Sequence, residues 1–335
     1  MIELRSDTFT KPTKGMLAKM FAATVGDDVW EEDFTVKALE QRIADMFKME
    51  AALFCPSGTM ANQIAIKVHT QAGDEVICDY SSHIYQYEAG GIAFNSSASV
   101  NLLQGENGKL NVALVAAALK EENIHFSTQS LVSVENTTNK GGGACYELLE
   151  LQKLSTFCKS KKLAFHMDGA RLFNAIVKTN TEASDYGTIF DSISVCMSKG
   201  LGAPIGSLLI GTKEFIAQAK RVRKVLGGGM RQVGYLAAAC DYALDTNIDL
   251  LEDDHRRASD IEATLKELPY VLEVLPVETN IVIFSVESPG DLVDYLKSLN
   301  ILCSAIGPKQ IRFVTHLQFT DEMLQELLKA LRNWA

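Results

Sequence analysis

The sequence predicts an α/β protein in which a large domain with a central, mainly parallel β-sheet is followed by a small α+β domain. Three observations support this fold class. Several short apolar runs show no alternation of polar and apolar residues, as expected of strands that helices cover on both faces. Stretches with apolar residues three or four positions apart, typical of amphipathic helices, lie between several of these runs. The pattern changes after about residue 245.

The first part of the chain contains the elements of the predicted sheet. Residues 35–48 are predicted to form a helix because apolar residues recur there at helical spacing: Val36, Leu39, Ile43 and Met46. A short apolar run follows, then a turn with Pro56 and Gly58, and then a second helix. Further strands are predicted at 75–79, 130–135, 163–168, 192–197 and 207–211, and a further helix at 148–160.

The C-terminal part has a different order of elements. Helices are predicted at 254–268, 290–299 and 320–333, and strands at 271–276, 280–285 and 310–315. The change of pattern divides the chain into a large domain, residues 1–245, and a small domain, residues 246–335.

Composition excludes several classes of protein. The 335 residues are 47% hydrophobic and 22% charged with a net charge of −10, and no lysine- or arginine-rich run is present, so no nucleic-acid partner is expected. The longest apolar run, 112–119, is too short to cross a membrane, and the N-terminus lacks the apolar core of a signal peptide. Seven scattered cysteines without Cys-x-x-Cys spacing argue against disulfides and zinc, and favour a cytoplasmic location. No spacing of His, Asp and Glu predicts a catalytic metal.

Three predicted strand ends carry residues that suggest chemistry, because ligands of open α/β sheets gather at the carboxyl ends of the strands. At 56–62 (PSGTMAN), Gly58 permits close approach of the backbone, and the following helix start could hold a phosphate. The same residues also fit a simple turn and helix cap.

The other two strand ends carry an acid and an amine. Asp168 closes one apolar run, where its carboxylate needs a partner, although Asp168 and Arg171 also fit a helix cap and a surface arginine. Lys199 follows another apolar run between small residues, where an amine could form a Schiff base or could simply extend to solvent. Taken together, a phosphate cradle, a strand-end aspartate and a strand-end lysine predict a pyridoxal 5′-phosphate site.

The chain resembles the L-threonine aldolase family, in the β-eliminating lyase/threonine aldolase group of fold-type-I pyridoxal phosphate enzymes. The resemblance runs nearly end to end through these segments: RSDT at 5–8, GDDV at 26–29, PSGTMAN at 56–62, SHIYQYEAGGIA at 82–93, HMDGARLFNA at 166–175, SKGLGAPIGSLLIG at 198–211, LGGGMRQ at 226–232 and RFVTH at 312–316.

The resemblance implies both a fold and an activity. The fold is a transferase-like large domain with a sheet of the seven-stranded type. The activity is that of a carbon–carbon lyase, which cleaves L-threonine or L-allo-threonine to glycine and acetaldehyde. The alternatives on the same scaffold are a β-eliminating lyase and an aldolase for phenylserine-like substrates.

The resemblance also implies roles for individual residues. Catalysis would use Lys199 as the Schiff-base lysine, Asp168 as the partner of the pyridinium nitrogen, and His83, which would stack on the cofactor ring. Gly58 and Thr59 would bind the phosphate, and a neighbouring subunit of a homodimer or homotetramer would add Lys224 and Arg231. The substrate carboxylate would be held by Ser6 of the N-terminal segment, by Arg171, which would also contact the cofactor, and by Arg312.

Two positions depart from the family pattern. Trp30-Glu31 stands where Tyr-Gly is usual, and Thr138 stands where the family usually has a histidine near the substrate side chain. A threonine hydroxyl is no base at neutral pH, so we assign the β-hydroxyl proton to His83 or to a water that it positions. Of the other histidines, His69, His125 and His255 are expected at the surface, whereas His166 shares a strand face with Asp168 and could support it.

Overall fold

The large part of the molecule is built on a seven-stranded sheet. In the computed structural model, which describes residues 1–334, its strand order is β2-β8-β7-β6-β5-β3-β4. β8 pairs antiparallel with β2 and with β7, and all other pairs in this sheet are parallel. The strands are β2 (Ala51–Cys55), β3 (Glu75–Asp79), β4 (Ser99–Leu103), β5 (Gln129–Glu135), β6 (Ala164–Gly169), β7 (Ser192–Cys196) and β8 (Ser207–Gly211).

Helices cover both faces of this sheet, which explains why its strands read as unalternated apolar runs. One face packs against α2 (Phe34–Phe47), α6 (Leu148–Ser160), α7 (Leu172–Thr179), α8 (Ala183–Gly187) and α10 (Gly234–Thr246). The other packs against α3 (Gly58–His69), α4 (His83–Gln86) and α9 (Lys213–Val225). In β2, Ala52 and Phe54 point to the first face while Leu53 and Cys55 point to the second. Further elements are α1 (Lys14–Phe21), α5 (Val112–Ala118), two 3₁₀ turns, Asp7–Phe9 and Asp28–Trp30, and a π-helical turn, Ile92–Ser96.

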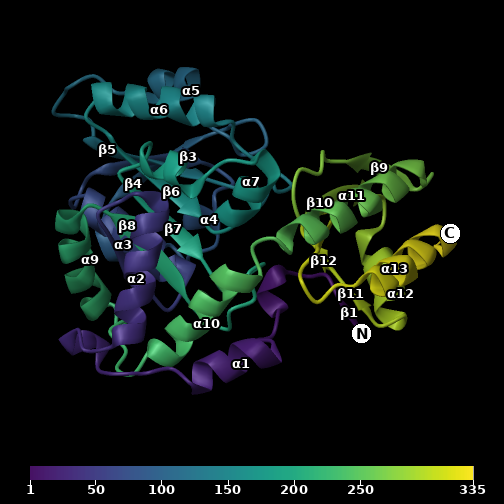
Figure 1. Ribbon diagram of the computed structural model, residues 1–335. Helices are drawn as coiled ribbons and strands as arrows, with labels where there is room; N and C mark the ends of the chain where they lie inside the picture. The colour runs from purple at the N-terminus through teal and green to yellow at the C-terminus, as the bar shows by residue number, and fades with distance from the viewer. Residues whose placement is uncertain (335) are drawn as a thin grey trace.

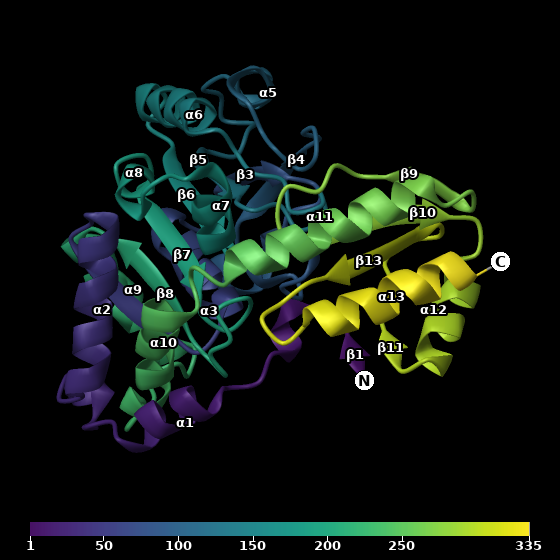
Figure 2. The ribbon, with the colours of Figure 1, turned by 45° about the vertical axis from the view of Figure 1, so that its right-hand side comes forward.

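The C-terminal part forms a separate lobe beside the large part, on the right in Figure 1. Its four-stranded antiparallel sheet has the order β12-β13-β10-β9, and three helices accompany it (Figure 2). The bounds are α11 (Leu251–Glu267), β9 (Val271–Val274), β10 (Ile281–Val286), α12 (Pro289–Ser298), β11 (Ile301–Leu302), β12 (Ser304–Ala305), β13 (Gln310–Val314) and α13 (Asp321–Asn333). The predicted α/β fold with an additional α+β part is therefore confirmed.

The first residues of the chain belong by their packing to this C-terminal part. β1 (Ile2–Glu3) pairs in parallel with β11, and Ile2 and Leu4 lie in the hydrophobic cluster of the small sheet and its helices. Figure 1 shows both chain ends on this side of the molecule. The chain then crosses to the large part, where α1 packs against α10. The division into 1–245 and 246–335 stays a prediction.

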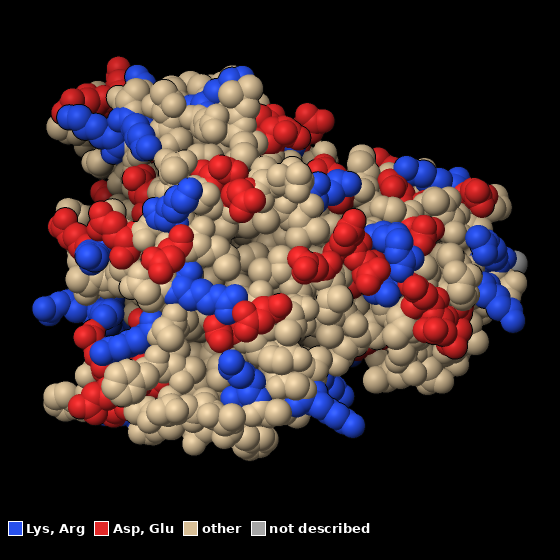
Figure 3. All heavy atoms as spheres, in the orientation of Figure 1, with Lys and Arg blue, Asp and Glu red and all other residues tan. Residues whose placement is uncertain are grey.

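Local sequence signals explain several element boundaries. Asp33 caps α2 by accepting hydrogen bonds from the backbone N–H groups of Thr35 and Val36, and Ser57 caps α3 by accepting one from Met60. α2 ends at Phe47, because the next residue, Lys48, adopts a left-handed conformation with φ of 49°. None of the helices formed by residues 1–334 combines the length and the apolar character that a membrane span requires. On the face shown in Figure 3, acidic and basic side chains are interspersed.

One of the three histidines expected at the surface is buried. His255 is 8% exposed on α11, and its Nε2 lies 3.0 Å from Oδ1 of Asn174 on α7, so the surface prediction for His255 is wrong. The prediction failed because α11 packs on α7, and the amide of Asn174 supplies the polar partner that a buried ring requires. His69 is half-buried and stacks on Phe215, whereas His125 is exposed as predicted.

Candidate active site

A cavity of about 330 Å³ lies where the carboxyl ends of β5, β6 and β7 meet the small sheet and the N-terminal segment. It brings together five residues that the sequence analysis selected, contributed by segments far apart in the chain. They are Ser6, His83, Arg171, Lys199 and Arg312, and the cavity is also lined by Thr8, Tyr87, Glu135, Asn139, Lys140, Ala170, Ser304 and Ile306.

Lys199 extends into this cavity from the loop after β7. Its Nζ lies 3.8 Å from Sγ of Cys196, a sulfur that also accepts a hydrogen bond from the Ser207 hydroxyl at 3.2 Å. A Cβ added at Gly58 would lie 2.6 Å from the same sulfur, so the start of α3 approaches Lys199 only because residue 58 is glycine. The predicted phosphate cradle and the predicted Schiff-base lysine are thus neighbours, with Thr59 exposed at the helix start.

Asp168 is buried, and a single amide links it to a second carboxylate. Its Oδ2 accepts a hydrogen bond from Nδ2 of Asn62 at 2.9 Å, and its Oδ1 accepts one from the backbone N–H of Ala170 at 3.1 Å. The same Nδ2 donates to Oε1 of Glu88 at 3.0 Å. Oδ1 of Asn62 lies 3.3 Å from Nε2 of His166, and burial lowers the pKa of His166 to about 3. His166 is therefore a neutral ring that supports the amide on which Asp168 depends.

His83 is held by two buried acids. Its backbone N–H donates to Oε2 of Glu135 at 2.8 Å, and its Nδ1 lies 3.1 Å from Oε1 of Glu88. Burial acts to lower the pKa of His83, but the hydrogen bond to Glu88 and the charge of Asp168 outweigh it, so the net shift is upward. Burial and the nearby charge of Asp168 raise the pKa of Glu135 to about 7. Neither Glu88 nor Glu135 was selected from the sequence, although Glu88 lies within a segment that carries the family resemblance.

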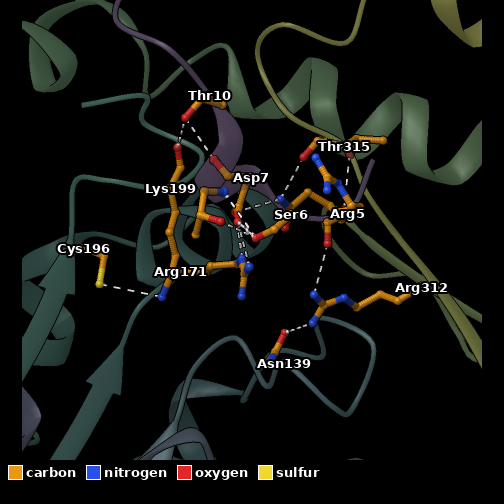
Figure 4. A network of polar contacts seen from close by, with 12 residues as sticks. Arg5, Ser6, Asp7, Thr10, Asn139, Arg171, Cys196, Lys199, Arg312 and Thr315 are labelled. Atoms are coloured by element: carbon orange, nitrogen blue, oxygen red, sulfur yellow. Dashed lines mark hydrogen bonds and ion pairs between the residues drawn. The ribbon is translucent and has the colours of Figure 1, made fainter. Parts of the chain in front are cut away.

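Arg171 is paired within the protein. Its Nε and NH2 donate to the two carboxylate oxygens of Asp7 at 2.8 and 2.7 Å (Figure 4). Burial raises the pKa of Asp7, but the charge and hydrogen bonds of Arg171 overcome this and lower it to about 2. No local pattern in the sequence indicates this pair, because Asp7 precedes Arg171 by more than 160 residues. The hydrogen bonds to Asp7 use two of the five N–H donors of Arg171, and NH1 is free for a ligand.

Arg312 has no such acid. On β13, its NH1 donates to the amide oxygen of Asn139 at 2.9 Å and its NH2 to the backbone carbonyl of Arg5 at 3.1 Å (Figure 4). Its Nε is buried without a hydrogen-bond partner. Burial and the charge of Arg171 lower the pKa of Arg312, as expected of a cation that lacks its counter-charge. The hydroxyl of Ser6 lines the same cavity, so the site presents a planar cation and a hydroxyl to an anion.

Comparison with known proteins places the chain among enzymes. The family model described as beta-eliminating lyase matches residues 3–289. The chain belongs to the β-eliminating lyase family. It is 41% identical to the low specificity L-threonine aldolase of Escherichia coli (strain K12), with 98% of this chain and 97% of that protein covered. It is 37% identical to the probable low-specificity L-threonine aldolase 2 of Arabidopsis thaliana, with 98% and 95% covered.

Solved structures of this kind share the fold. The threonine aldolase of Leishmania major matches with a TM-score of 0.89 at 20% identity, over 99% of both chains. A putative L-allo-threonine aldolase from Listeria monocytogenes matches with a TM-score of 0.83 at 20% identity, over 99% of this chain and 95% of that chain. The large mainly parallel sheet and the small antiparallel sheet therefore form a threonine aldolase fold.

Two residues with an expected role in this family lie outside the cavity. Lys224 is exposed at the end of α9 and lines a separate cavity of about 430 Å³ together with Asp28, Val29 and Lys220. Arg231 is exposed and pairs with Asp27 at 2.9 Å. Within one chain, neither residue reaches the cavity that Lys199 lines.

The two departures from the family pattern also lie outside the cavity. Thr138 is buried against Gly108 and Gly141, its backbone N–H donates to the carbonyl of Ala144, and it is not among the residues that line the cavity. The residues after it, Asn139 and Lys140, line the cavity instead. Trp30 is 74% exposed.

Proposed function

We propose that the protein cleaves β-hydroxy-α-amino acids by a retro-aldol reaction with pyridoxal phosphate, and that L-threonine or L-allo-threonine yields glycine and acetaldehyde. The observation that carries this proposal is the combination, in one cavity, of the Lys199 amine with a guanidinium, Arg312, that has no acid partner. Family membership and the names of the relatives at 37–41% identity support the same reaction.

The residues of the site fit this cofactor. Lys199 would hold it through its amine, Asp168 would face the ring nitrogen, and Gly58 and Thr59 at the start of α3 would face the phosphate. Both oxygens of Asp168 accept hydrogen bonds, from Asn62 and from the backbone N–H of Ala170, which hold the carboxylate in a fixed orientation. When bound, pyridoxal phosphate supplies the ring into which the electrons of the broken bond flow.

The chain's own residues orient the substrate. Arg312, the remaining NH1 of Arg171 and the hydroxyl of Ser6 would hold the α-carboxylate, because together they offer the donors that a planar anion accepts. Holding this group sets which bond at Cα stands perpendicular to the cofactor plane, and therefore which bond breaks. Asn139 and the carbonyl of Arg5 hold Arg312 in place before substrate arrives.

His83 is the residue that we assign to the proton of the β-hydroxyl, directly or through a water. Its Nδ1 is engaged by Glu88, so Nε2 is the ring atom left for a substrate. Its upward-shifted pKa makes it a stronger base than an ordinary histidine. Because Thr138 does not line the cavity, it takes no part in this step.

A second copy of the chain would complete the phosphate site. Lys224 and Arg231 lie beside exposed apolar side chains on connected segments: Trp30 is 74% exposed, Phe34 71% and Val225 85%. The pair of Arg223 with Asp28 at 2.8 Å joins α9 to the turn that carries Trp30. We therefore propose a homodimer or homotetramer in which these cations face the neighbour's cofactor. All seven cysteines are free and buried, in keeping with the proposed cytoplasmic location.

The experiment is product analysis with the purified, cofactor-loaded protein. L-Threonine, L-allo-threonine and L-phenylserine are supplied separately, and glycine, aldehyde and pyruvate are measured in each sample. Equal amounts of glycine and aldehyde are expected, with no pyruvate. Pyruvate and ammonia without glycine would instead identify a β-eliminating lyase. The variant Lys199→Ala should lose the visible absorbance of the lysine-bound cofactor, and retention of that band would contradict the assignment of Lys199.

A further inference from the structure

The cavity contains a cation, Lys140, that has no role in the proposed retro-aldol reaction. Lys140, two residues after Thr138, is half-buried and lines the cavity together with Tyr87 and Ile306. Its Nζ lies 5.7 Å from the centre of the Tyr87 ring and 3.4 Å from the carbonyl oxygen of Ile306. Within residues 1–334, no carboxylate lies within ion-pair distance of this ammonium group.

The other charged residues named for this cavity either have a partner within the protein or a proposed role in the reaction. Asp7 neutralises Arg171, and Arg312, which contacts Asn139, is proposed to bind the α-carboxylate of the substrate. The acid that lines the same cavity, Glu135, accepts the backbone N–H groups of His83 and Asn139 at 2.8 and 2.7 Å. Lys140 therefore remains as a positive charge without a counter-charge.

A substrate that fills the cavity removes water from this ammonium group. The loss of hydration costs free energy unless the substrate supplies a negative charge in exchange. The methyl group of threonine carries no charge and cannot do so. A carboxylate at the end of the substrate side chain would pair with Lys140, while Tyr87 and Ile306 would contact its carbon atoms.

We infer that Lys140 makes the site selective for β-hydroxy-α-amino acids whose side chain ends in a carboxylate. This inference rests on the proposed retro-aldol function and names its substrate class. The simplest such substrate is 3-hydroxyaspartate. Its Cα–Cβ bond breaks, the proton of the β-hydroxyl passes to the base, Cα gains one proton, and the products are glycine and glyoxylate.

The test compares 3-hydroxyaspartate with 3-hydroxyasparagine, which has nearly the same shape but carries a neutral amide. Glycine release gives kcat/KM for each compound, and the ratio of acid to amide is the quantity of interest. In the unchanged protein this ratio is expected to exceed one. In Lys140→Met it should fall about five- to tenfold, because the ammonium group is absent. Lys140→Arg keeps the charge and should keep the ratio.

Two controls separate this effect from structural damage and from failure of the proposed function. Lys266→Met removes an exposed lysine of α11 that pairs with Glu262, and should leave the ratio unchanged. Added salt should lower the ratio of the unchanged protein but not that of Lys140→Met. Titration calorimetry with L-aspartate and L-asparagine, which lack the β-hydroxyl and are not cleaved, measures the same selectivity without turnover.

The outcomes have distinct meanings. Glycine from L-threonine together with an equal acid-to-amide ratio in the unchanged protein and in Lys140→Met would overturn the assignment of Lys140 and leave the aldolase proposal standing. No glycine from L-threonine or from either test compound would instead overturn the proposed function. A ratio that falls in Lys140→Met and is kept in Lys140→Arg supports the inference.

Discussion

The two arginines of the cavity differ in whether an acid neutralises them, and this difference indicates which of them binds the substrate carboxylate. Arg171 is neutralised by the bidentate pair with Asp7, whereas Arg312 contacts only an amide oxygen and a backbone carbonyl. A paired arginine is a fixed part of the protein, but a cation without an acid gains most when an anion arrives. The α-carboxylate of the substrate is therefore expected to depend mainly on Arg312.

Replacing Arg312 with lysine keeps the charge but removes the planar fork of donors. We expect Arg312→Lys to lower kcat/KM for L-threonine roughly 10- to 100-fold, mainly through a higher KM. Steady-state glycine release measures this effect. Arg256→Lys, at an exposed arginine that pairs with Asp321, is the control and should behave like the unchanged protein. An unchanged KM in Arg312→Lys would remove Arg312 from the carboxylate site.

Glu88 is expected to set the proton affinity of His83. Its hydrogen bond raises the pKa of His83, so Glu88→Gln should lower that pKa, and the acid limb of the kcat/KM profile should move to lower pH. The side-chain amide keeps a similar shape and can still contact Asn62. Nuclear magnetic resonance of the His83 ring measures the pKa directly. Glu150→Gln, at a half-exposed glutamate on α6, is the control. A pKa of His83 that does not move would exclude this role for Glu88.

At the scale of elements, the start of α3 and the loop after β7 meet without a side chain between them. Gly58 permits this approach because the space that a Cβ would need is taken by the sulfur of Cys196. The contact brings the N-terminus of a twelve-residue helix close to the Lys199 loop. The phosphate cradle that we propose therefore depends on packing between two elements as well as on its own sequence.

The substitution Gly58→Ala is expected to push α3 away from Cys196. We expect it to weaken pyridoxal phosphate binding about tenfold and to lower the free energy of unfolding by about 1–3 kcal/mol, as in other overpacked sites. Cofactor titration and urea denaturation of the cofactor-free protein measure the two effects. Gly290→Ala is the matched control, because no atom lies within 4 Å of its added Cβ. Equal cofactor affinity in both variants would show that Gly58 has no part in the cradle.

At the scale of the whole molecule, α11 joins the large part to the small sheet and carries a buried acid (Figure 2). Asp254 is 0% exposed, and both of its carboxylate oxygens lack a hydrogen-bond partner. Burial raises the pKa of Asp254 to about 8, although Arg257 at 3.7 Å opposes the shift. The folded protein therefore retains a proton that the unfolded chain releases near pH 4.

The stability of the protein should accordingly depend on Asp254 between about pH 4 and 8. Because its pKa is higher in the folded state, its contribution is lost as the pH rises through this window. We expect Asp254→Asn to reduce the decline in unfolding free energy from pH 5 to 8 by about 1 kcal/mol or more. Denaturation at several pH values measures this decline. Asp253→Asn, at the exposed neighbouring acid, should leave it unchanged, and equal pH profiles of both variants would refute the prediction.

Assembly of two chains at the apolar surface near Trp30 gives a test by complementation. Lys199→Ala removes the amine of a chain's own cavity, and Lys224→Ala removes a cation that we propose acts in the neighbour's site. A mixed dimer then contains one intact site and one doubly altered site. Refolding the two variants together should restore about one quarter of the unchanged activity, since half of the dimers are mixed. Activity equal to the mean of the separate variants would show that Lys224 acts within its own chain.

The elements and the principal chemistry of this protein follow from local patterns in its sequence. Continuous apolar runs predicted most of the strands, because helices cover both faces of the large sheet. Apolar periodicity predicted about half of the helices, because it shows which face of a helix meets the core. Parallel strands of a sheet end at one edge, so the positions of Asp168 and Lys199 after two such strands were enough to predict that they lie near one another. The resemblance to threonine aldolases added His83 and Arg312, which local patterns alone do not single out.

The tertiary structure alone decided which charges are paired and which are free. Asp7 contacts Arg171, which lies 164 positions further along the chain. Glu88 contacts Asn62, 26 positions away, and His83, 5 positions away. Such contacts leave no periodic signal, because they depend on where the fold brings separate segments together. The same reason explains why β1 pairs with β11, why His255 is buried, and why Lys140 lines the cavity but Thr138 does not. Burial then fixes the electrostatics, since a charge that has lost water must find its partner in the fold or in a ligand.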